Sequence, residues 1–285
     1  MSVERNCEVC GAGAQDLLYT VNDFPIVRCR ECRLVFVGRV VGEQELIDLY
    51  DADYWEGPEA VGYRGYATAE ARKRHHFRSL LADVERLSPP PGDLVEIGSA
   101  YGFFLDEARR RGWRVRGVEP SGHAVRHARE VLGLDVRAGT FDEQPTEPGS
   151  ADVVAMWDVI EHLPHPAQTV AKAAEWLRPG GLIAISTGDV ESLSARLHGR
   201  DWSLMTPPWH QFYFSRRTLS RLLRGTGFRV VRTLGDGVLA ADPGAASRRL
   251  PGWAERALCS RLVSGAARRL GLGGTMFVFA RKGGA

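Results

Sequence analysis

The chain has 285 residues, of which 44% are hydrophobic, and this is enough to bury one substantial core and a small second module. A formal net charge of +2 is too small to indicate a nucleic-acid-binding surface. The sequence has no apolar run as long as a membrane span and no basic-then-apolar signal segment near its start. A cytoplasmic protein without a membrane span is therefore expected.

Four of the five cysteines form two Cys-x-x-Cys pairs, Cys7 with Cys10 and Cys29 with Cys32, separated by eighteen residues. Short β-like runs lie beside these pairs, and Gly11 follows the first of them. This spacing predicts a zinc ribbon over residues 1–38, in which four thiolates bind a structural Zn²⁺. Free buried cysteines and redox chemistry are the alternatives. The fifth cysteine, Cys259, has a helical pattern around it and is expected to be a buried thiol.

Residues 39–88 are expected to form a helical linker or lid, with helices at about 43–50 and 68–87. The aromatic segment at 63–66 and the second helix either cover a sheet edge or form a lid over a substrate pocket, to which Tyr63, Tyr66, His75 or His76 would contribute. The proline-rich stretch at 88–92 then marks the start of a catalytic domain that spans 89–285.

Within that domain, runs typical of strands and helices alternate. Strands are expected at 94–96, 114–119, 135–138, 151–157, 182–187, 228–234 and 274–280, and helices at 103–111, 122–132, 167–177 and 216–225. This alternation predicts an α/β fold with a parallel, doubly wound sheet, whose ligands bind at the carboxyl ends of the strands. A basic helical insert at about 245–270 is expected to cover the sheet edge or a partner in a homodimer, and a membrane surface or an anionic substrate is the alternative.

The first of these strands leads into the loop Glu96-x-Gly98-x-x-x-Gly102. A glycine at position 98 lets the backbone approach a ligand closely, and the helix after Gly102 presents unpaired N–H groups. The spacing differs from Gly-x-Gly-x-x-Gly, because Ala100 replaces a middle glycine. Glu119 ends the second strand, where a ribose-binding carboxylate is expected. Together these residues predict a nucleoside-like ligand, and an ordinary strand-turn-helix is the alternative.

Four motifs in this order resemble those of class I S-adenosylmethionine-dependent methyltransferases: Glu96-x-Gly98-x-x-x-Gly102, Gly117-Val118-Glu119-Pro120-Ser121, Trp157-Asp158-Val159-Ile160-Glu161-His162-Leu163 and Leu177-Arg178-Pro179-Gly180-Gly181. The resemblance implies a Rossmann-like, seven-stranded sheet that binds S-adenosylmethionine. The cofactor contacts it implies are Glu96, Gly98, Ser99, Ala100, Gly102, Glu119, Pro120, Thr140, Phe141, Trp157 and Asp158. Many members carry Asp near position 140, so here the adenine contact is expected from the backbone and the Phe141 ring. The cysteine module resembles that of bacterial sugar methyltransferases.

Two histidines are candidates for the general base. His210 lies in a segment that resembles the His-x-x-Tyr-Phe-Ser motif of sugar and related small-molecule methyltransferases, although Trp209 precedes it where sugar C-methyltransferases tend to carry Glu. The alternative for His210 is a cap of the helix at 216–225. His162 follows the fourth strand, and its alternative role is to brace that loop.

The most direct interpretation is an S-adenosylmethionine-dependent O-methyltransferase that acts on a hydroxyl of a sugar, nucleotide-sugar or secondary metabolite. A sugar C-methyltransferase, an RNA methyltransferase and a non-catalytic cofactor-binding scaffold are the alternatives.

Overall fold

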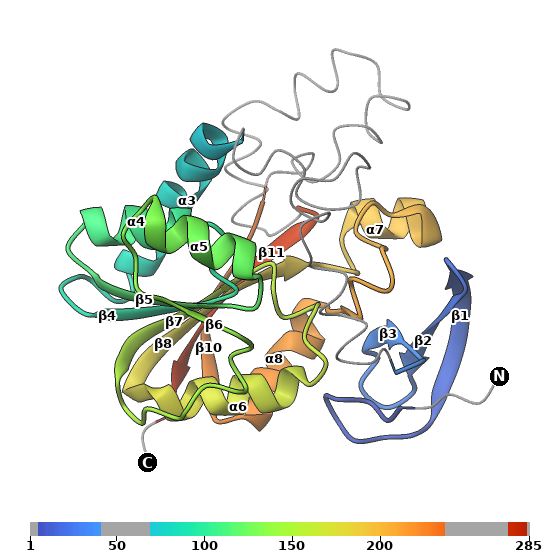
Figure 1. Cartoon of the computed structure of the whole chain (residues 1–285). Coiled ribbons are helices and arrows are strands. Elements are labelled where there is room, and N and C mark those ends of the chain that lie inside the picture. The colour runs from blue at the N-terminus through green and yellow to red at the C-terminus, as the bar shows by residue number, and fades with distance from the viewer. Residues whose placement is uncertain (1–4, 41–68, 237–272, 284–285) are drawn as a thin grey trace, which may run out of the picture. The chain divides into compact units, whose positions relative to one another are not determined.

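The computed structural model describes residues 5–40, 69–236 and 273–283 (Figure 1). The expected helix at 43–50, the candidates Tyr63 and Tyr66, Cys259 and the basic insert at 245–270 lie outside these residues. Within them, no helix is both long enough and apolar enough to cross a bilayer.

A seven-stranded sheet with the strand order β10-β11-β8-β7-β4-β5-β6 forms the core of the fold. Its strands are β4 (Asp93–Ile97), β5 (Arg114–Glu119), β6 (Val136–Ala138), β7 (Ala151–Trp157), β8 (Leu177–Gly188), β10 (Phe228–Gly235) and β11 (Thr275–Lys282). The helices are α3 (Glu70–Glu85), α4 (Phe103–Arg110), α5 (Gly122–Glu130), α6 (Pro166–Trp176) and α8 (Arg216–Gly225). The expected seven-stranded, doubly wound sheet is therefore confirmed.

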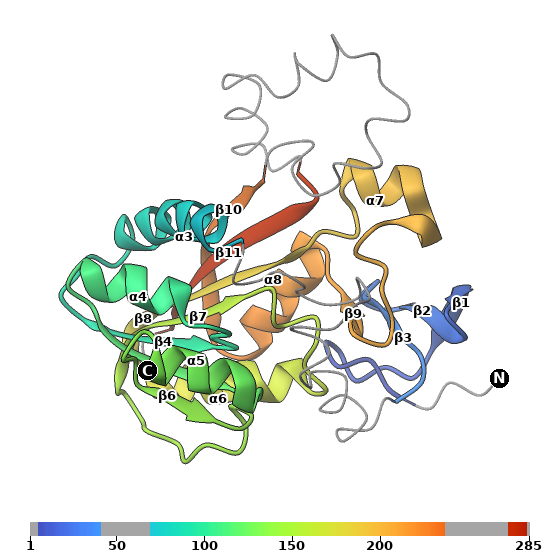
Figure 2. The same cartoon turned by 45° about the horizontal axis from the view of Figure 1, so that its top comes forward.

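The sheet is mixed, which corrects the expectation that all strands run parallel. β4 pairs in parallel with β5 and β7, and β5 pairs in parallel with β6. At β11 the direction reverses, because Asp189 N donates to Gly274 O and Asp236 N donates to Thr275 O. The start of β11 thus lies beside the ends of β8 and β10, its neighbours in the sheet (Figures 1 and 2). Antiparallel neighbours need no helical crossover, so βα alternation could not reveal this strand's direction.

Parallel pairing places the carboxyl ends of β4, β5 and β7 next to one another. Ile97 of β4 is in register with Val118 of β5 and with Met156 of β7. All four residues of the apolar run from Val153 to Met156 are 0% exposed, as expected of a strand covered on both faces. The carboxyl ends of β4, β5 and β7 therefore form one edge.

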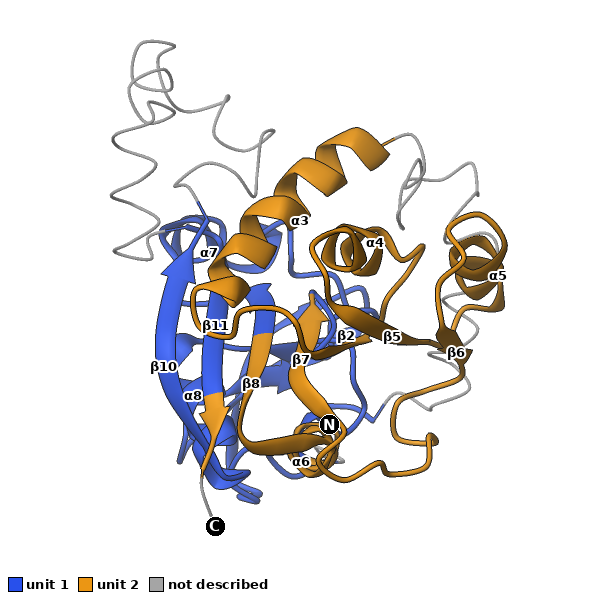
Figure 3. Ribbon diagram, turned by 90° about the vertical axis from the view of Figure 1, so that its left-hand side faces the viewer, with its two compact units in different colours: residues 1–41, 158–167, 185–280 blue, residues 42–157, 168–184, 281–285 orange. Residues whose placement is uncertain are grey.

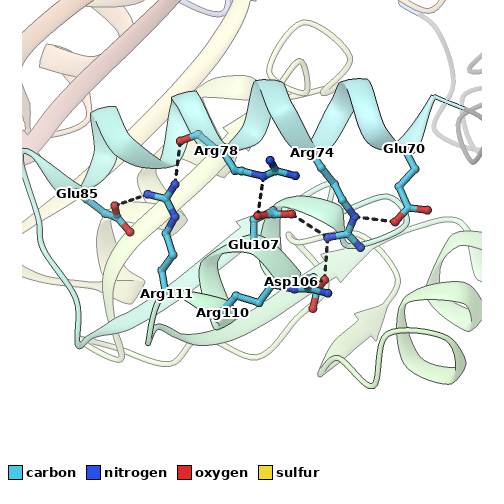
Figure 4. A network of polar contacts seen from close by, with 8 residues as sticks. All are labelled: Glu70, Arg74, Arg78, Glu85, Asp106, Glu107, Arg110 and Arg111. Atoms are coloured by element: carbon cyan, nitrogen blue, oxygen red, sulfur yellow. Dashed lines mark hydrogen bonds and ion pairs between the residues drawn. The ribbon is translucent and has the colours of Figure 1, made fainter.

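The buried charges of α3 and α4 are paired across the two helices (Figure 4). Arg74 Nη1 donates to Asp106 Oδ2 at 2.8 Å and to Glu107 Oε1 at 3.2 Å, and Arg78 Nε donates to Glu107 Oε2 at 3.1 Å. Removing one partner would leave a buried charge uncompensated, so this network fixes α3 on α4. His75 and His76 lie on α3 with exposed side chains.

A second, four-stranded antiparallel sheet has the order β1-β2-β3-β9. Its strands are β1 (Gln15–Val21), β2 (Phe24–Cys29), β3 (Val35–Val37) and β9 (Phe212–Tyr213). The strand β9 comes from a distant segment and pairs Tyr213 with Val35. Sequence reasoning missed β2, which contains Pro25, and β9, which has two residues. Two short helices, α7 (Leu193–His198) and the 3₁₀ helix η1 (Gly199–Asp201), lie in the segment between β8 and β9.

The N-terminal strands share a hydrophobic core with the segment that precedes β9. This ribbon core consists of Ile26, Val35, Val37, Ala195, Trp202, Met205 and Tyr213, with Leu18, Tyr19, Val21, Phe24, Val190 and Leu204 packed against it. Accordingly, residues 1–41, 158–167 and 185–280 form one compact unit, and residues 42–157, 168–184 and 281–285 form another (Figure 3). The domain ranges 1–38, 39–88 and 89–285 expected from the sequence stay predictions.

Candidate functional site

The loop after β4 has an unusual backbone. Gly98, Ala100 and Gly102 have φ values of 70°, 47° and 83°, all in the left-handed region. A Cβ at Gly102 would lie 2.5 Å from Leu134 Cδ1, so this position requires glycine for space as well as for conformation. At Ala100 a residue with a side chain adopts such a φ, and strain of this kind is found at ligand-binding loops.

The carboxylate of Glu119 closes this loop onto the end of β5. Glu119 Oε2 accepts from Ala100 N at 2.9 Å, and Oε1 accepts from Ser121 N at 2.9 Å. Burial raises the pKa of Glu119 to about 7, against the lowering effect of these two N–H donors. Each carboxylate oxygen retains capacity for another hydrogen bond, as ribose hydroxyls would require.

Glu96 lies at the same edge and is 3% exposed. Burial, followed by the charge of Glu119, raises the pKa of Glu96 well above its ordinary value. Among the described residues nothing is in hydrogen-bond contact with Glu96 Oε2 or with the Ser99 hydroxyl. Buried polar atoms without protein partners are expected where a ligand supplies the partner.

Of the other expected cofactor contacts, Pro120 lies at the surface and Phe141 lies in the core. Pro120 is exposed after β5. Thr140 N donates to Glu143 Oε2 at 2.8 Å, and the buried Thr140 hydroxyl lies near the same carboxylate. The Phe141 ring is buried against Trp176, with 5.1 Å between the ring centroids.

Trp157 is the last residue of β7, which pairs with β4, and Asp158 follows it. The Trp157 ring packs edge-on against Phe104 at 5.1 Å, and its Nε1 is one of the buried atoms for which no described residue is a partner. Asp158 has a φ of 53°. Ser186 Oγ donates to Asp158 Oδ1 at 2.7 Å and accepts from Asp158 N at 2.9 Å, which holds this conformation.

The structure brings the two candidate histidines together. The rings of His162 and His210 meet edge to face, with 4.6 Å between centroids. His162 Nδ1 lies 2.8 Å from Trp209 O, and His210 Nδ1 lies 2.7 Å from Leu204 O. A carbonyl oxygen can only accept, so each Nδ1 carries the proton and each Nε2 carries the lone pair.

Burial lowers the pKa of both rings. His162 also experiences the charge of His210, and its pKa lies well below the ordinary value. For His210, the Leu204 carbonyl and Asp158 oppose the effect of burial. Both imidazoles are therefore neutral near pH 7 and can act as bases or as ligands. The expected alternative for His210 does not hold, because the side chain of Ser215 caps α8 by accepting from Thr218 N.

Sequence reasoning missed the residues that hold this pair. Glu161 O accepts from Gln211 N at 2.8 Å and from Phe212 N at 3.2 Å, which joins the two segments that carry the histidines. Arg5 Nη1 donates to Gln211 Oε1 at 3.2 Å, and its guanidinium lies 4.7 Å from the centre of the Phe212 ring. No sequence pattern indicated this contact, because Arg5 and Gln211 lie 206 positions apart in the chain.

The four N-terminal cysteines also converge. Cys7 Sγ lies 3.4 Å from Cys32 Sγ, Cys10 Sγ lies 3.5 Å from Cys29 Sγ, and all four sulfurs lie within 4.8 Å of one another. A tetrahedral zinc with bonds of about 2.3 Å needs sulfurs about 3.8 Å apart, so this cluster is compatible with a zinc ribbon. Gly11 and Arg33, which follow the second cysteine of each pair, have similar φ values of 74° and 72°.

Comparison with known proteins identifies the class. Residues 71–233 match the model of the methyltransferase domain family, so the chain belongs to that family. It is a class I S-adenosylmethionine-dependent methyltransferase and acts on some acceptor.

Two groups of relatives support this assignment. The chain is 30% identical over 197 residues to a Mycolicibacterium smegmatis protein named "probable S-adenosylmethionine-dependent methyltransferase", with coverage of 69% of this chain and 67% of that protein. It is also 30% identical over 128 residues to the ubiquinone biosynthesis O-methyltransferase of Ralstonia nicotianae, covering 42% of this chain and 53% of that protein. The chain thus spans about half the length of this second relative.

Solved structures share the fold. An S-adenosylmethionine-dependent methyltransferase from Thermotoga maritima has a TM-score of 0.56 at 23% identity and covers 76% of this chain and 94% of its own. One from Mesorhizobium loti has a TM-score of 0.53 at 15% identity, with 72% and 96% covered.

Proposed function

We propose that this enzyme transfers the methyl group of S-adenosylmethionine to a hydroxyl oxygen of a small molecule, and that the oxygen belongs to a sugar, a nucleotide-linked sugar or another secondary metabolite. The observation that carries the proposal is the neutral pair His162 and His210, whose Nδ1 atoms are tied to main-chain carbonyls. Relatives named ubiquinone biosynthesis O-methyltransferase support oxygen as the acceptor atom.

In this proposal the loop after β4 and the end of β5 bind the cofactor. Glu119 accepts hydrogen bonds from the ribose hydroxyls through the capacity that Ala100 N and Ser121 N leave on its two oxygens. The left-handed backbone between Gly98 and Gly102 lets the chain pass close to the cofactor. When bound, S-adenosylmethionine supplies a methyl group on a positively charged sulfur, which any well-placed nucleophile can displace.

The acceptor must supply that nucleophile. A hydroxyl is a weak nucleophile until its proton is removed, and a positioned imidazole with a free lone pair performs this task. We assign His210 as the base, with His162 as the second candidate. The Leu204 carbonyl fixes the tautomer of His210, and Asp158 stabilises the imidazolium that forms when the ring takes the proton.

The cysteine cluster has a structural role in this proposal. One Zn²⁺ bound by Cys7, Cys10, Cys29 and Cys32 would close a tetrahedral shell with no open position for a substrate. Through the ribbon core, the same module supports Trp202, Met205 and Leu204, the segment that leads to His210.

The test is a panel of acceptors offered with S-adenosylmethionine. A catechol, a nucleotide-linked sugar, a free hexose and transfer RNA are each incubated with the purified chain, released S-adenosylhomocysteine is quantified, and mass spectrometry locates the methyl group. The proposal predicts release with a hydroxylated small molecule and a methyl group on oxygen.

The remaining outcomes contradict the proposal in distinct ways. A methyl group on carbon would indicate a sugar C-methyltransferase, and methylation of RNA alone would indicate an RNA enzyme. Cofactor binding without release on any acceptor would indicate a non-catalytic scaffold.

A further inference from the structure

Three side chains of metal-binding type meet beside the histidine pair. Glu161, His162 and His210 each offer one ligand atom, and these atoms lie within 4.8 Å of one another. The carboxylate is buried and the two rings are half-buried. Two imidazoles and one carboxylate form a donor set that suits divalent first-row transition metals, unlike the four soft thiolates of the cysteine cluster.

The orientation of the two rings is that of metal-binding histidines. In such sites the imidazole donates its second N–H to a carbonyl or carboxylate, which fixes the tautomer and makes the other nitrogen a better ligand. Here Trp209 O and Leu204 O accept from the two Nδ1 atoms at 2.8 Å and 2.7 Å. The nitrogen through which each ring can coordinate a cation is therefore Nε2.

Glu161 supplies an independent observation that points to a ligand. Its side chain is 4% exposed, and Oε2 has no hydrogen-bond partner among the described residues. A buried carboxylate oxygen without a partner is costly, and a cation would remove that cost. Asp158 adds a second negative charge that acts on both Glu161 and His210.

The backbone holds these ligands in place before any cation binds. Glu161 O accepts from Gln211 N and Phe212 N, and Gln211 Nε2 donates to His162 O at 3.2 Å. Three hydrogen bonds thus join the segment that carries Glu161 and His162 to the segment that follows His210. A site preorganised in this way loses little freedom when it binds a metal.

We propose that Glu161, His162 and His210 bind one divalent transition-metal cation, through a carboxylate oxygen and the two Nε2 atoms. Three protein ligands leave coordination positions open, which a hydroxyl oxygen of the acceptor can occupy. This catalytic consequence rests on the function proposed above, whereas cation binding itself does not.

The cation would change how the acceptor loses its proton. A metal-bound hydroxyl has a lowered pKa, so its O–H bond breaks and the proton passes to solvent water. The oxygen lone pair then forms the new bond to the methyl carbon while the carbon–sulfur bond breaks, and the sulfur leaves as neutral S-adenosylhomocysteine. In the loaded enzyme His210 is a ligand, and in the metal-free enzyme it is the base.

Manganese is the probe that separates this site from the cysteine cluster, because thiolates select softer ions. The chain is loaded with one equivalent of Zn²⁺, which four thiolates bind in preference to two imidazoles and a carboxylate, and elemental analysis verifies one zinc per chain. This protein is then titrated with Mn²⁺, and the paramagnetic resonance signal of free Mn²⁺ reports binding. We expect one Mn²⁺ per chain for the wild type. In His210→Ala and Glu161→Gln we expect the affinity to fall by at least about tenfold.

The matched control is His165→Ala. His165 lies on the same loop as His162, with an exposed ring that contacts Glu8 instead of the cluster, so this variant should bind Mn²⁺ as the wild type does. Circular dichroism and affinity for S-adenosylmethionine verify folding. If His210→Ala does not fold, the wild type and the nearly isosteric Glu161→Gln still decide the question.

Failure of this inference is distinguishable from failure of the proposed function. A wild type that binds no Mn²⁺, or variants that bind it as tightly as the wild type does, would overturn the metal site. If a wild type that binds no Mn²⁺ still methylated oxygen, His210 would remain the proposed base. Conversely, Mn²⁺ binding without methylation of any acceptor would support the site and remove the proposed function.

Discussion

The imidazole rings of His162 and His210 lie edge to face, 4.6 Å apart between centroids, although forty-eight positions separate them in the chain. Hydrogen bonds from Gln211 N and Phe212 N to Glu161 O join the two segments. The N-terminal ribbon reinforces this junction, because Val37 N donates to Gln211 O at 2.8 Å and Arg5 contacts both Gln211 and Phe212. The cysteine module is thus part of the unit that carries the histidines.

Replacing Glu119 with Ala tests the cofactor site. The substitution removes the carboxylate that holds Ala100 N and Ser121 N and that is proposed to bind the ribose. Affinity for S-adenosylmethionine should fall by about 1–3 kcal/mol, the value of charge-assisted hydrogen bonds. Calorimetric titration measures this change, and Glu130→Ala, at an exposed position on α5, is the control. Equal affinities for Glu119→Ala and the wild type would place the ribose elsewhere.

Cofactor binding should depend on pH through the same side chain. The pKa of Glu119 is raised to about 7, so the carboxylate gains a proton as the pH falls through that value and loses hydrogen-bond acceptor capacity. Affinity for S-adenosylmethionine should rise from about pH 6 to about pH 8, by at most about tenfold per pH unit. In Glu119→Gln, which has no proton to lose, this dependence should vanish. Titrations across that pH range would refute the assignment if both proteins behaved alike.

Gly117 tests the packing that supports the loop. A Cβ at this position would lie 2.7 Å from Ser99 Oγ and 2.8 Å from Leu105 Cδ1. Gly117→Ala should therefore lower the free energy of unfolding by about 1–3 kcal/mol and weaken cofactor binding. Gly225 in α8 has no atom within 4 Å of a Cβ, so Gly225→Ala should be neutral or stabilising by up to about 1 kcal/mol. Urea unfolding compares the two, and a Gly117→Ala protein as stable as the wild type would contradict the packing.

Loss of the cysteine cluster should affect the histidine segment more than the cofactor loop. Cys29→Ser removes one of four thiolates, and we expect zinc content to fall from about one ion per chain to almost none. Because the ribbon core includes Trp202 and Met205, proteolysis between β8 and β9 should accelerate and turnover should fall. Affinity for S-adenosylmethionine should persist. Elemental analysis and limited proteolysis measure these effects, with Cys259→Ser as the control that keeps its zinc.

The local elements were predictable because their signals are local. The strand at 151–157 and the helix at 216–225 have the predicted bounds. A continuous apolar run predicts a buried strand and a 3.6-residue period predicts a helix, and both patterns can be recognised from consecutive residues alone. The direction of β11 and the two-residue strand β9 depend on distant partners, and no local pattern encodes them.

The same distinction applies to the candidate site. The Gly98 loop, Glu119 and the two histidines could be proposed from motifs and spacing. Glu161 was visible beside His162, yet only its position against His210 indicates a ligand. Arg5 and Gln211 could not be found in advance, because their contact joins residues 206 positions apart.

The central claim is that the histidine pair activates an acceptor hydroxyl for methylation by S-adenosylmethionine. The most direct test compares the wild type with His210→Asn, using an acceptor from the panel, by measuring kcat for oxygen methylation and the calorimetric affinity for S-adenosylmethionine. We expect kcat to fall by about 10²–10⁴-fold, as when a general base is lost, and the affinity for S-adenosylmethionine to be unchanged. An unchanged kcat in His210→Asn, or a methyl group on carbon or nitrogen, would contradict the central claim.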